Sequence, residues 1–407
     1  MLRNRSLAGL VAAELLSLTG SAMTFVALPW FVLQTTGSTA KMSWVLAAEL
    51  LPVVLVGIPA GSAIVRLGAK RTILISDAVR GPLLVVIPIL HRSGHLTFPA
   101  LLAVTFAIGV FTAPYFASSR IVVPEIVGDD ERIVAQMNAL LSGANQITQI
   151  AGPVLAGLLI AAAGPSAVLV VDGCSYLLSF LVIALLVSVG KAAAPSAESG
   201  GLLAGLGFLM RDGLLGPIVI VACALNFFVQ GLIVGLQALA FFRYDADARV
   251  LGYLFAAFGA GALCGALAAQ RLVRDVDLLK LAAVAIVAMP LPLFVLGFSV
   301  PWTAAIVVVA AVGFCTPLVN APLMGVLTVR TPEALRPKVL TAVLAVASLA
   351  GPLGFVVAGE SLRFVPLSTF FFVLPALLLL GSLTFAGVVL SRRGSPDTLA
   401  PSRIAPG

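Results

Sequence analysis

Residues 35–71 read TTGSTAKMSWVLAAELLPVVLVGIPAGSAIVRLGAKR, and this stretch decides the fold class. Between Lys41 and Arg66 the residues are mostly apolar or small, and Glu49 is the one charge. A helix rises about 1.5 Å per residue, so roughly 20 apolar residues in a row cross the ~30 Å hydrocarbon core of a bilayer. The stretch therefore predicts a membrane-spanning helix followed by a short, positively charged loop.

The composition of the whole chain agrees with a membrane protein. Of its 407 residues, 60% are hydrophobic and 10% are charged, whereas an average soluble domain carries about 25% charged residues. The formal net charge of +7 would suit a nucleic-acid partner only if Lys and Arg clustered on a soluble module, but they stand in short loops between apolar runs. We therefore expect the lipid bilayer as the surroundings and no nucleic acid as a partner.

Similar apolar runs recur along the chain and predict an all-α membrane protein with twelve transmembrane helices. The expected spans are residues 7–33, 43–65, 72–90, 98–118, 135–162, 166–189, 215–242, 250–272, 278–298, 302–329, 339–359 and 366–390. Residues 191–213 mix small, polar and charged residues, which is typical of a linker. We expect an N-terminal six-helix half at 1–190, a cytoplasmic linker at 191–213, a C-terminal six-helix half at 214–391 and a disordered cytoplasmic tail at 392–407.

The distribution of Lys and Arg predicts the orientation in the membrane. If the N-terminus is cytoplasmic, eighteen of the 24 basic residues lie on that side, with Arg120 counted among its loops, whereas five lie opposite and Arg80 lies within a span. Cytoplasmic loops carry the excess of Lys and Arg. We therefore expect a multi-pass protein of the inner, or plasma, membrane with both termini in the cytoplasm.

An internal repeat relates the two halves. Ala113-Pro114 precedes Pro124-Glu125, and Ala321-Pro322 precedes Pro332-Glu333 at the same offset. The pattern favours a duplication with the same topology in each half, so we expect two six-helix pseudo-repeat bundles. Parallel repeats of this kind place a substrate site near the middle of the membrane.

The cysteines indicate neither a redox role nor a metal site. All four lie inside apolar runs, with no CxxC spacing and no cluster of histidines nearby. Buried, inert thiols are the simplest interpretation, so we expect no disulfide, no metal and no cofactor. The residues concerned are Cys174, Cys223, Cys264 and Cys315.

Four stretches carry a resemblance to a known family. They are residues 35–71, quoted above, 123–159 (VPEIVGDDERIVAQMNALLSGANQITQIAGPVLAGLL), 171–180 (VDGCSYLLSF) and 331–354 (TPEALRPKVLTAVLAVASLAGPLG). They resemble the major facilitator superfamily, specifically its branch of bacterial macrolide and siderophore exporters, which are drug:proton antiporters. The resemblance covers nearly the whole chain and implies the two-bundle fold of that superfamily.

The resemblance assigns a gating role to the loop after the second span. In the family pattern an Asp commonly precedes the loop Arg and helps to hold the two halves in one state, whereas this chain has Val65 there. Asp77 and Arg80 are spaced i and i+3, so they are neighbours on a helix and could supply a substitute ion pair. The alternative is a pair that only fixes helix packing. The signature residues of the loop are Gly61, Arg66, Gly68, Lys70 and Arg71.

Gly152 and Pro153 open the segment GPVLAG, which resembles a motif in the fifth span of exporters of this superfamily. Ala156 stands where a Gly is usual. Gly and Ala permit close helix approach, and Pro frees a carbonyl and permits a bend that a rocking helix can use. Plain packing of small residues is the alternative.

Three acidic residues within the spans are candidates for proton coupling, namely Glu14, Glu49 and Asp172. A charged side chain at the bilayer centre costs at least about 2.5 kcal/mol, so each buried acid needs a reason. Desolvation disfavours the charged carboxylate and a nearby cation favours it, so such a group can bind a proton reversibly. The alternative for each is a shallow, water-reached or permanently paired residue.

Polar residues form stripes along three of the expected helices. Amides that faced lipid would lack hydrogen-bond partners, so the stripes must face other helices or a watery cavity. In the family the first and seventh spans line the central cavity, and interhelical hydrogen bonding is the alternative. With Glu14, the candidate cavity residues are Ser17, Ser21 and Thr24 in the first span, Asn138, Asn145 and Gln149 in the fifth, and Asn226, Gln230 and Gln237 in the seventh.

These patterns and the resemblance to the major facilitator superfamily together predict a secondary active transporter and not an enzyme. It would export a small amphipathic or lipophilic compound, such as a drug, antibiotic or siderophore, by alternating access and in exchange for protons, as a monomer. A nucleotide-binding GxxxxGK[ST] and an HExxH are both missing from the sequence, which excludes ATP hydrolysis within this chain. The alternatives are a nutrient importer or facilitator on the same fold, and a membrane sensor that transports nothing.

Overall fold

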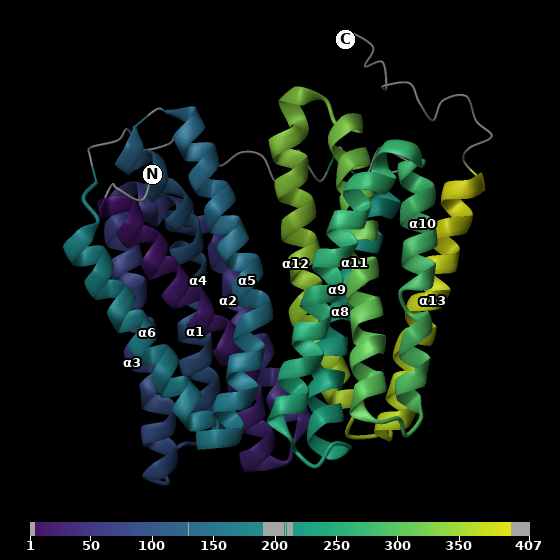
Figure 1. Ribbon diagram of the computed structural model, residues 1–407, viewed down its shortest axis with the longest axis horizontal. Coiled ribbons are helices and arrows are strands. Elements are labelled where there is room, and N and C mark those ends of the chain that lie inside the picture. The colour runs from purple at the N-terminus through teal and green to yellow at the C-terminus, as the bar shows by residue number, and fades with distance from the viewer. Residues whose placement is uncertain (1–4, 129, 190–206, 208, 210–214, 392–407) are drawn as a thin grey trace. The chain divides into compact units, whose positions relative to one another are not determined.

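The computed structural model describes residues 5–128, 130–189, 207, 209 and 215–391. Except for Gly207 and Leu209, the predicted linker at 191–213 lies outside these residues, and so does the predicted tail at 392–407. Within the described part every regular element is a helix (Figure 1). The elements are α1 (Arg5–Thr36), α2 (Thr39–Leu67), α3 (Ala69–Arg92), α4 (Phe98–Val127), α5 (Glu131–Ala163), α6 (Pro165–Leu186), α8 (Leu215–Phe242), α9 (Ala248–Asp275), α10 (Leu278–Ala288), η1 (Leu291–Gly297), α11 (Trp302–Arg330), η2 (Glu333–Leu335), α12 (Arg336–Ser361) and α13 (Leu367–Ser391).

The twelve predicted spans are confirmed as helical segments. The described chain holds 12 candidate spans that are long and apolar enough to cross a membrane, and each overlaps one predicted span. The seventh was predicted at the residues that α8 occupies. The prediction of an all-α, twelve-span membrane protein therefore holds.

The ninth predicted span, residues 278–298, is not one continuous α-helix. The α-helix α10 ends at Ala288, and a 3₁₀-helix, η1, follows from Leu291 to Gly297. Pro290 and Pro292 explain the break, because proline has no N–H to donate and its ring clashes with the preceding turn. The tighter 3₁₀ turns continue the span across the rest of the membrane.

The fourth predicted span, residues 98–118, ends too early. Helix α4 runs through Arg120 and Pro124 to Val127, and stops at Gly128, whose φ of 71° suits glycine. Arg120 therefore lies within α4 and not in a loop, and its assignment to the cytoplasmic side stays a prediction. From α4 its side chain reaches across to Asn138 on α5.

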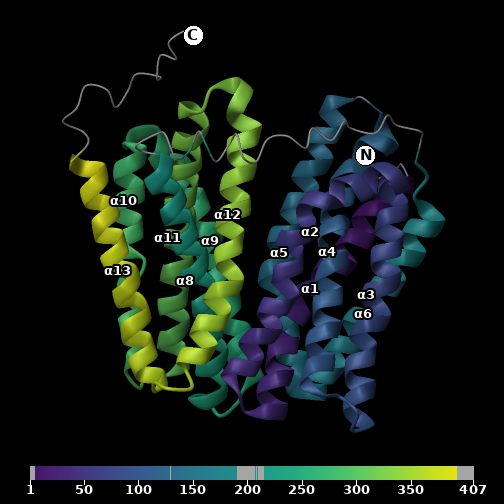
Figure 2. The same cartoon turned by 180° about the vertical axis from the view of Figure 1, so that it is seen from behind.

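Helices α1 to α6 pack on one another over long, close contacts (Figures 1 and 2). Helix α1 is buried along most of its length and lies against α5 and α6, while α3 lies against α4 and α6. Glycines permit this approach. A Cβ on Gly81 of α3 would come within 2.9 Å of the carbonyl oxygen of Gly173 on α6, and the reverse distance is also 2.9 Å. Small residues at helix crossings are the usual means of close packing in membranes.

The described chain separates into two compact units that do not follow the predicted halves. The first unit holds α1 to α6 together with Ile233–Ala256 and Phe355–Phe364, and the second holds the remaining parts of α8, α9 and α12 with α10, α11 and α13. Within the first unit, two hydrogen bonds join the end of α12 to α2. The Thr39 hydroxyl donates to the Gly359 carbonyl at 3.1 Å, and the Trp44 indole donates to the Glu360 carboxylate at 3.0 Å. The division into six-helix halves stays a prediction.

Candidate transport site

A network of polar side chains fills the interior of the first unit. It is built from α1, α3, α4 and α6, and most of its members are buried. Polar groups inside a helix bundle that lipid surrounds must satisfy one another, so the contacts within the network determine what each group can do.

Asp77 and Arg80 of α3 form the ion pair that their spacing predicted. Arg80 Nη2 lies 2.7 Å from Asp77 Oδ1, and their side chains are 1% and 0% exposed. The Ser179 hydroxyl on α6 donates to Asp77 Oδ2 at 2.7 Å. The pair thus links α3 to α6 inside one unit, and its role in gating stays a prediction.

The Arg80 side chain is held between two tyrosine rings. Its guanidinium carbon lies 4.1 Å from the ring centroid of Tyr115 on α4 and 4.2 Å from that of Tyr176 on α6. Each desolvated cation–π contact contributes up to about 2 kcal/mol. With Asp77 beside it and these two rings against it, Arg80 is held in one position.

Asp172 of α6 is the second fully buried carboxyl of the network. The Thr24 hydroxyl of α1 donates to its Oδ2 at 2.5 Å, and the Ser175 hydroxyl donates to its Oδ1 at 3.1 Å. Gly20 lies against it, because a Cβ added there would overlap Asp172 Oδ1. Only glycine therefore fits at this point of α1.

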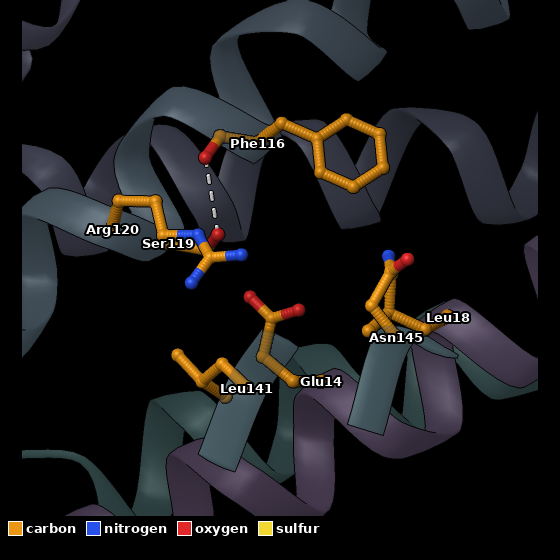
Figure 3. A pocket seen from close by; sticks show the side chains of 7 residues that line it. All are labelled: Glu14, Leu18, Phe116, Ser119, Arg120, Leu141 and Asn145. Carbon is orange, nitrogen blue, oxygen red and sulfur yellow. Dashed lines mark hydrogen bonds between the residues drawn. The ribbon is translucent and has the colours of Figure 1, made fainter. Parts of the chain in front are cut away.

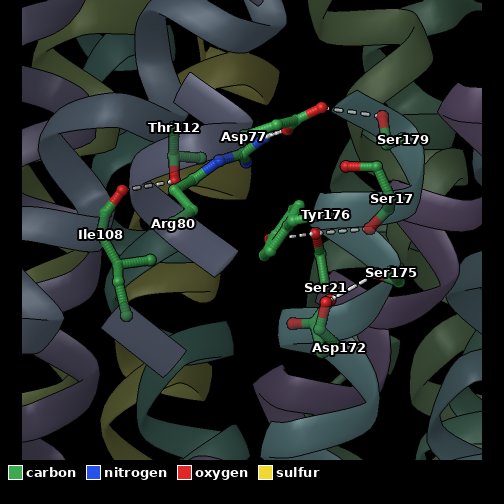
Figure 4. A network of polar contacts seen from close by, with 10 residues as sticks. All are labelled: Ser17, Ser21, Asp77, Arg80, Ile108, Thr112, Asp172, Ser175, Tyr176 and Ser179. Atoms are coloured by element: carbon green, nitrogen blue, oxygen red, sulfur yellow. Dashed lines mark hydrogen bonds and ion pairs between the residues drawn. The ribbon is translucent and has the colours of Figure 1, made fainter. Parts of the chain in front are cut away.

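The predicted polar stripe of α1 faces this network. The Ser21 hydroxyl lies 2.8 Å from the Tyr176 hydroxyl and donates to the Ser17 carbonyl at 2.7 Å (Figure 4). Ser17, like Thr24, is buried. Ser21 and Thr24 contact α6 within the bundle, so a role of this stripe in lining a substrate cavity stays a prediction.

Glu14 opens onto a small pocket between α1, α4 and α5. The pocket is narrow and partly open to solvent. Glu14 is only 4% exposed, and its Oε1 has no hydrogen-bond partner among the described residues. Figure 3 shows its carboxylate directed toward the guanidinium group of Arg120, although the two do not approach within ion-pair distance. The lining residues are Glu14, Leu18, Phe116, Ser119, Arg120, Leu141 and Asn145.

Glu49, the third candidate acid, lies apart from that pocket. It is half-buried on α2, where a Cβ on Gly109 of α4 would overlap its backbone carbonyl. Its Oε2 is buried and has no hydrogen-bond partner among the described residues. The structure therefore does not bring Glu49 and Glu14 together at one pocket.

The polar residues of the fifth and seventh spans are not brought to one place. Of the three in α5, Asn145 lines the Glu14 pocket, the Asn138 side chain accepts from Arg120 at 3.4 Å, and Gln149 is exposed. In α8, Gln237 is fully buried and Asn226 is exposed, donating to the Ala222 carbonyl at 3.0 Å, while Gln230 is half-buried. Their assignment to a substrate cavity stays a prediction.

The loop between α2 and α3 is tied to the first unit. Gly68, with φ of 83°, forms the turn between the two helices, and Lys70 Nζ donates to the Val187 carbonyl at 2.6 Å near the end of α6. A cation suits the carbonyl end of a helix. Arg66 and Arg71 are exposed, and Gly61 lies within α2. The predicted gating function of the loop stays a prediction.

Gly152 and Pro153 lie where α5 crosses other helices. A Cβ on Gly152 would overlap the Ala22 side chain of α1, and a Cβ on Gly252 of α9 would come 2.6 Å from the Pro153 carbonyl. Gly152 and Pro153 thus permit the close packing of α5 on α1 and α9. The part that a bend at Pro153 plays in transport stays a prediction.

Several members of the site were not selected from the sequence. Tyr176 and Ser179 follow Asp172 at i+4 and i+7, so the same helical spacing that marked α1 would have found them on the Asp172 face of α6. Tyr115 carries no such signal, because a tyrosine in a membrane span is usually a packing or interfacial residue. Arg120 was missed because α4 was ended before it.

Comparisons with known proteins agree with this architecture. A family model described as Major Facilitator Superfamily matches residues 10–355. The multidrug efflux pump Tap of Mycolicibacterium fortuitum is 29% identical over 352 residues, covering 84% of this chain and 85% of Tap. The protein of the same name from Mycobacterium tuberculosis is 26% identical over 358 residues, covering 85% of this chain and 84% of that protein.

Solved structures show the same fold at low identity. The nucleoside transporter NupG superposes with a TM-score of 0.73 at 14% identity, covering 96% of this chain and 99% of NupG. A bacterial homologue of the human lysosomal transporter Spinster, in an inward-facing and occupied conformation, gives 0.68 at 15% identity, covering 95% of this chain and 94% of that one.

Proposed function

Because the chain belongs to the major facilitator superfamily, whose members are membrane transporters, we propose that it exports small amphipathic or lipophilic organic compounds in exchange for protons. The export direction and the substrate class are supported by relatives named multidrug efflux pumps that align over about 85% of this chain. The observation that carries the coupling chemistry is the Glu14 pocket.

Glu14 has the properties that a coupling acid needs. It is almost fully buried, it keeps one carboxylate oxygen without a partner among the described residues, and the pocket beside it is partly open to solvent. A buried carboxylate without a full set of partners gains from binding either a proton or a donor group of a substrate. Because both would use the same oxygen, binding of one favours release of the other.

The remaining walls of the pocket suit an amphipathic compound. Leu18, Phe116 and Leu141 supply apolar surface, whereas Asn145 and Arg120 supply hydrogen-bond donors. Apolar walls with a few placed polar groups are typical of small-molecule sites. Arg120 also places a positive charge opposite Glu14, which would assist loss of the proton once the substrate has left.

The transport cycle that we propose is alternating access by a monomer in the plasma membrane. Both termini would lie in the cytoplasm, as the distribution of Lys and Arg predicts. The proton would load Glu14 when the pocket faces outward, and the substrate would replace it when the pocket faces the cytoplasm.

The test is transport into inverted membrane vesicles under an imposed pH gradient. Uptake of lipophilic dyes and antibiotics is compared between the native chain, Glu14→Gln and the control Glu131→Gln, which changes an exposed acid in the first turn of α5. We expect gradient-driven uptake by the native chain and the control, and none by Glu14→Gln.

Two results would overturn the proposal. Flux that ignores both the gradient and the Glu14→Gln change would contradict proton coupling through this residue. Nutrient uptake in the opposite direction, with no accumulation of any dye or antibiotic, would make the protein an importer.

A further inference from the structure

Two carboxyls are equally buried in the network but have different neighbours. Asp77 and Asp172 are both 0% exposed. Asp77 has Arg80 at 2.7 Å, whereas no basic nitrogen of the described residues lies within 4.0 Å of the Asp172 carboxyl. An isolated ionised carboxylate away from water is costly enough that such a group usually becomes neutral instead.

The charged and titratable groups around Asp172 do not supply a free counter-ion. Arg80 faces it from α3 but is committed to Asp77 and to the two tyrosine rings. The other neighbours are the acid Glu49 from α2 and the neutral Tyr176 from its own helix. Helix α1 places Gly20 and the hydroxyl of Thr24 against it, and neither residue is charged. The titratable residues of α5, Glu131 and Arg132, lie in the first turn of that helix.

The hydrogen bonds of Asp172 can all be kept when the carboxyl carries a proton. A protonated carboxyl donates one hydrogen bond and accepts others, and a hydroxyl can do both. The contacts with Thr24 at 2.5 Å and with Ser175 at 3.1 Å therefore fit the neutral acid. The Ser175 hydroxyl also reaches the Asp172 carbonyl at 2.8 Å, so it has an alternative acceptor.

Helix α1 closes the site. A Cβ on Gly20 would overlap Asp172 Oδ1, so no side chain fits between the two residues. The Thr24 hydroxyl donates a hydrogen bond to the other carboxylate oxygen, Oδ2. The view of the network in Figure 4 has Asp172 beside Ser21 and Ser175, below Tyr176. Asp172 is 0% exposed in this arrangement, so water reaches its carboxyl only after helices around it have moved.

We propose that Asp172 is a second proton-binding site, neutral while α1 is packed on α6, which exchanges its proton only when these two helices move apart. It differs from Glu14, whose pocket is partly open to solvent in the same arrangement. The inference rests on the proposed proton coupling only for its part in transport, because the bound proton itself is a property of the resting protein.

The test is infrared spectroscopy on the purified protein in lipid, without substrate or pH gradient. The spectrum of each variant is subtracted from that of the native protein. A neutral carboxylic acid has a C=O stretch that a carboxylate lacks. We expect one such band to disappear in Asp172→Asn and to remain in Glu131→Gln, a control that removes an exposed acid in the first turn of α5 and leaves Arg80 paired with Asp77. A second variant, Asp172→Glu, keeps the acid and should move the band without removing it, which covers the case in which Asp172→Asn does not fold.

Exchange with deuterated water tests the closure. The Asp172 band should shift slowly in the resting protein and faster during transport, whereas any band from Glu14 should shift at once. A spectrum that Asp172→Asn and Asp172→Glu leave unchanged would overturn the inference, and so would immediate exchange at rest. Either result would leave proton coupling through Glu14 untouched, while loss of dye export in Glu14→Gln with an intact Asp172 band would support both.

Discussion

The helices before and after the linker differ sharply in what they bury. From α1 to α6 the buried side chains include Glu14, Asp77, Arg80 and Asp172, with many serines and threonines. From Leu215 onward, the described buried polar side chains are Gln237, Thr331 and Ser382, and none is charged. Both sets of helices are equally able to cross a membrane.

This difference teaches that a shared architecture does not require a shared interior. The repeated Ala-Pro and Pro-Glu pairs predict that the two sets descend from one ancestor, yet the buried charges of the described chain are confined to one of them. Intramembrane charges are expensive and are kept where they serve a function. We infer that proton chemistry belongs to α1–α6 and that the later helices contribute mainly apolar surface.

The largest effect should come from removing the buried cation. Arg80→Leu would leave the Asp77 carboxylate buried without its cation and would remove the cation–π contacts with Tyr115 and Tyr176. Breaking a buried ion pair lowers the free energy of unfolding by about 3–5 kcal/mol. Glu333→Gln removes the acid of an exposed pair after α11, in which Glu333 is 88% exposed, and should cost roughly 0–1 kcal/mol. Thermal unfolding in detergent measures both. Equal losses of stability in the two variants would contradict the difference drawn here between the buried charges of α1–α6 and the exposed ion pair after α11.

The next effect should come from filling the contact between α1 and α6. Gly20→Ala places a methyl group onto Asp172 Oδ1 and should destabilise by about 1–3 kcal/mol. Gly381→Ala in α13 meets nothing within 4 Å and should be neutral or slightly stabilising, because Ala favours a helix over Gly by about 1 kcal/mol. The same unfolding assay applies, and a Gly20→Ala protein as stable as the native chain would contradict the packing described here.

The smallest effect should come from the loop between α2 and α3. Lys70→Met loses the 2.6 Å hydrogen bond to the Val187 carbonyl and should cost about 1 kcal/mol. Arg71→Met, at the exposed neighbouring position, is the control and should change stability little. If Lys70→Met were to abolish export while leaving stability unchanged, the loop would act in gating and not in holding α6.

The sequence predicted most of the fold, and the reasons for its failures are local. Long apolar runs marked all twelve spans, since a bilayer requires them. The break in the ninth span was marked by Pro290 and Pro292 and could have been predicted from them. The continuation of α4 past Arg120 was missed because it depends on whether neighbouring helices satisfy the charged group. Composition around one residue does not contain that information.

Those parts of the site that lie within a single helix could be predicted from the sequence. The Asp77 and Arg80 pair and the α1 stripe followed from helical spacing, because residues three or four apart share a face. The stacking of Tyr115 and Tyr176 on Arg80 and the contact of Gly20 with Asp172 join helices far apart in the chain. No spacing within one segment indicates such pairs.

The contact between Gly20 and Asp172 has a consequence for the history of this family of sequences. A side chain at position 20 would collide with the side chains of Asp172 and Ser175, and loss of the acid would remove most of that collision, so we expect the two sites to change together. A relative with alanine at the position of Gly20 should then have lost the carboxyl on its sixth helix. A comparison of related sequences for joint loss of this glycine and this aspartate would separate relatives that keep the acid from relatives that lack it.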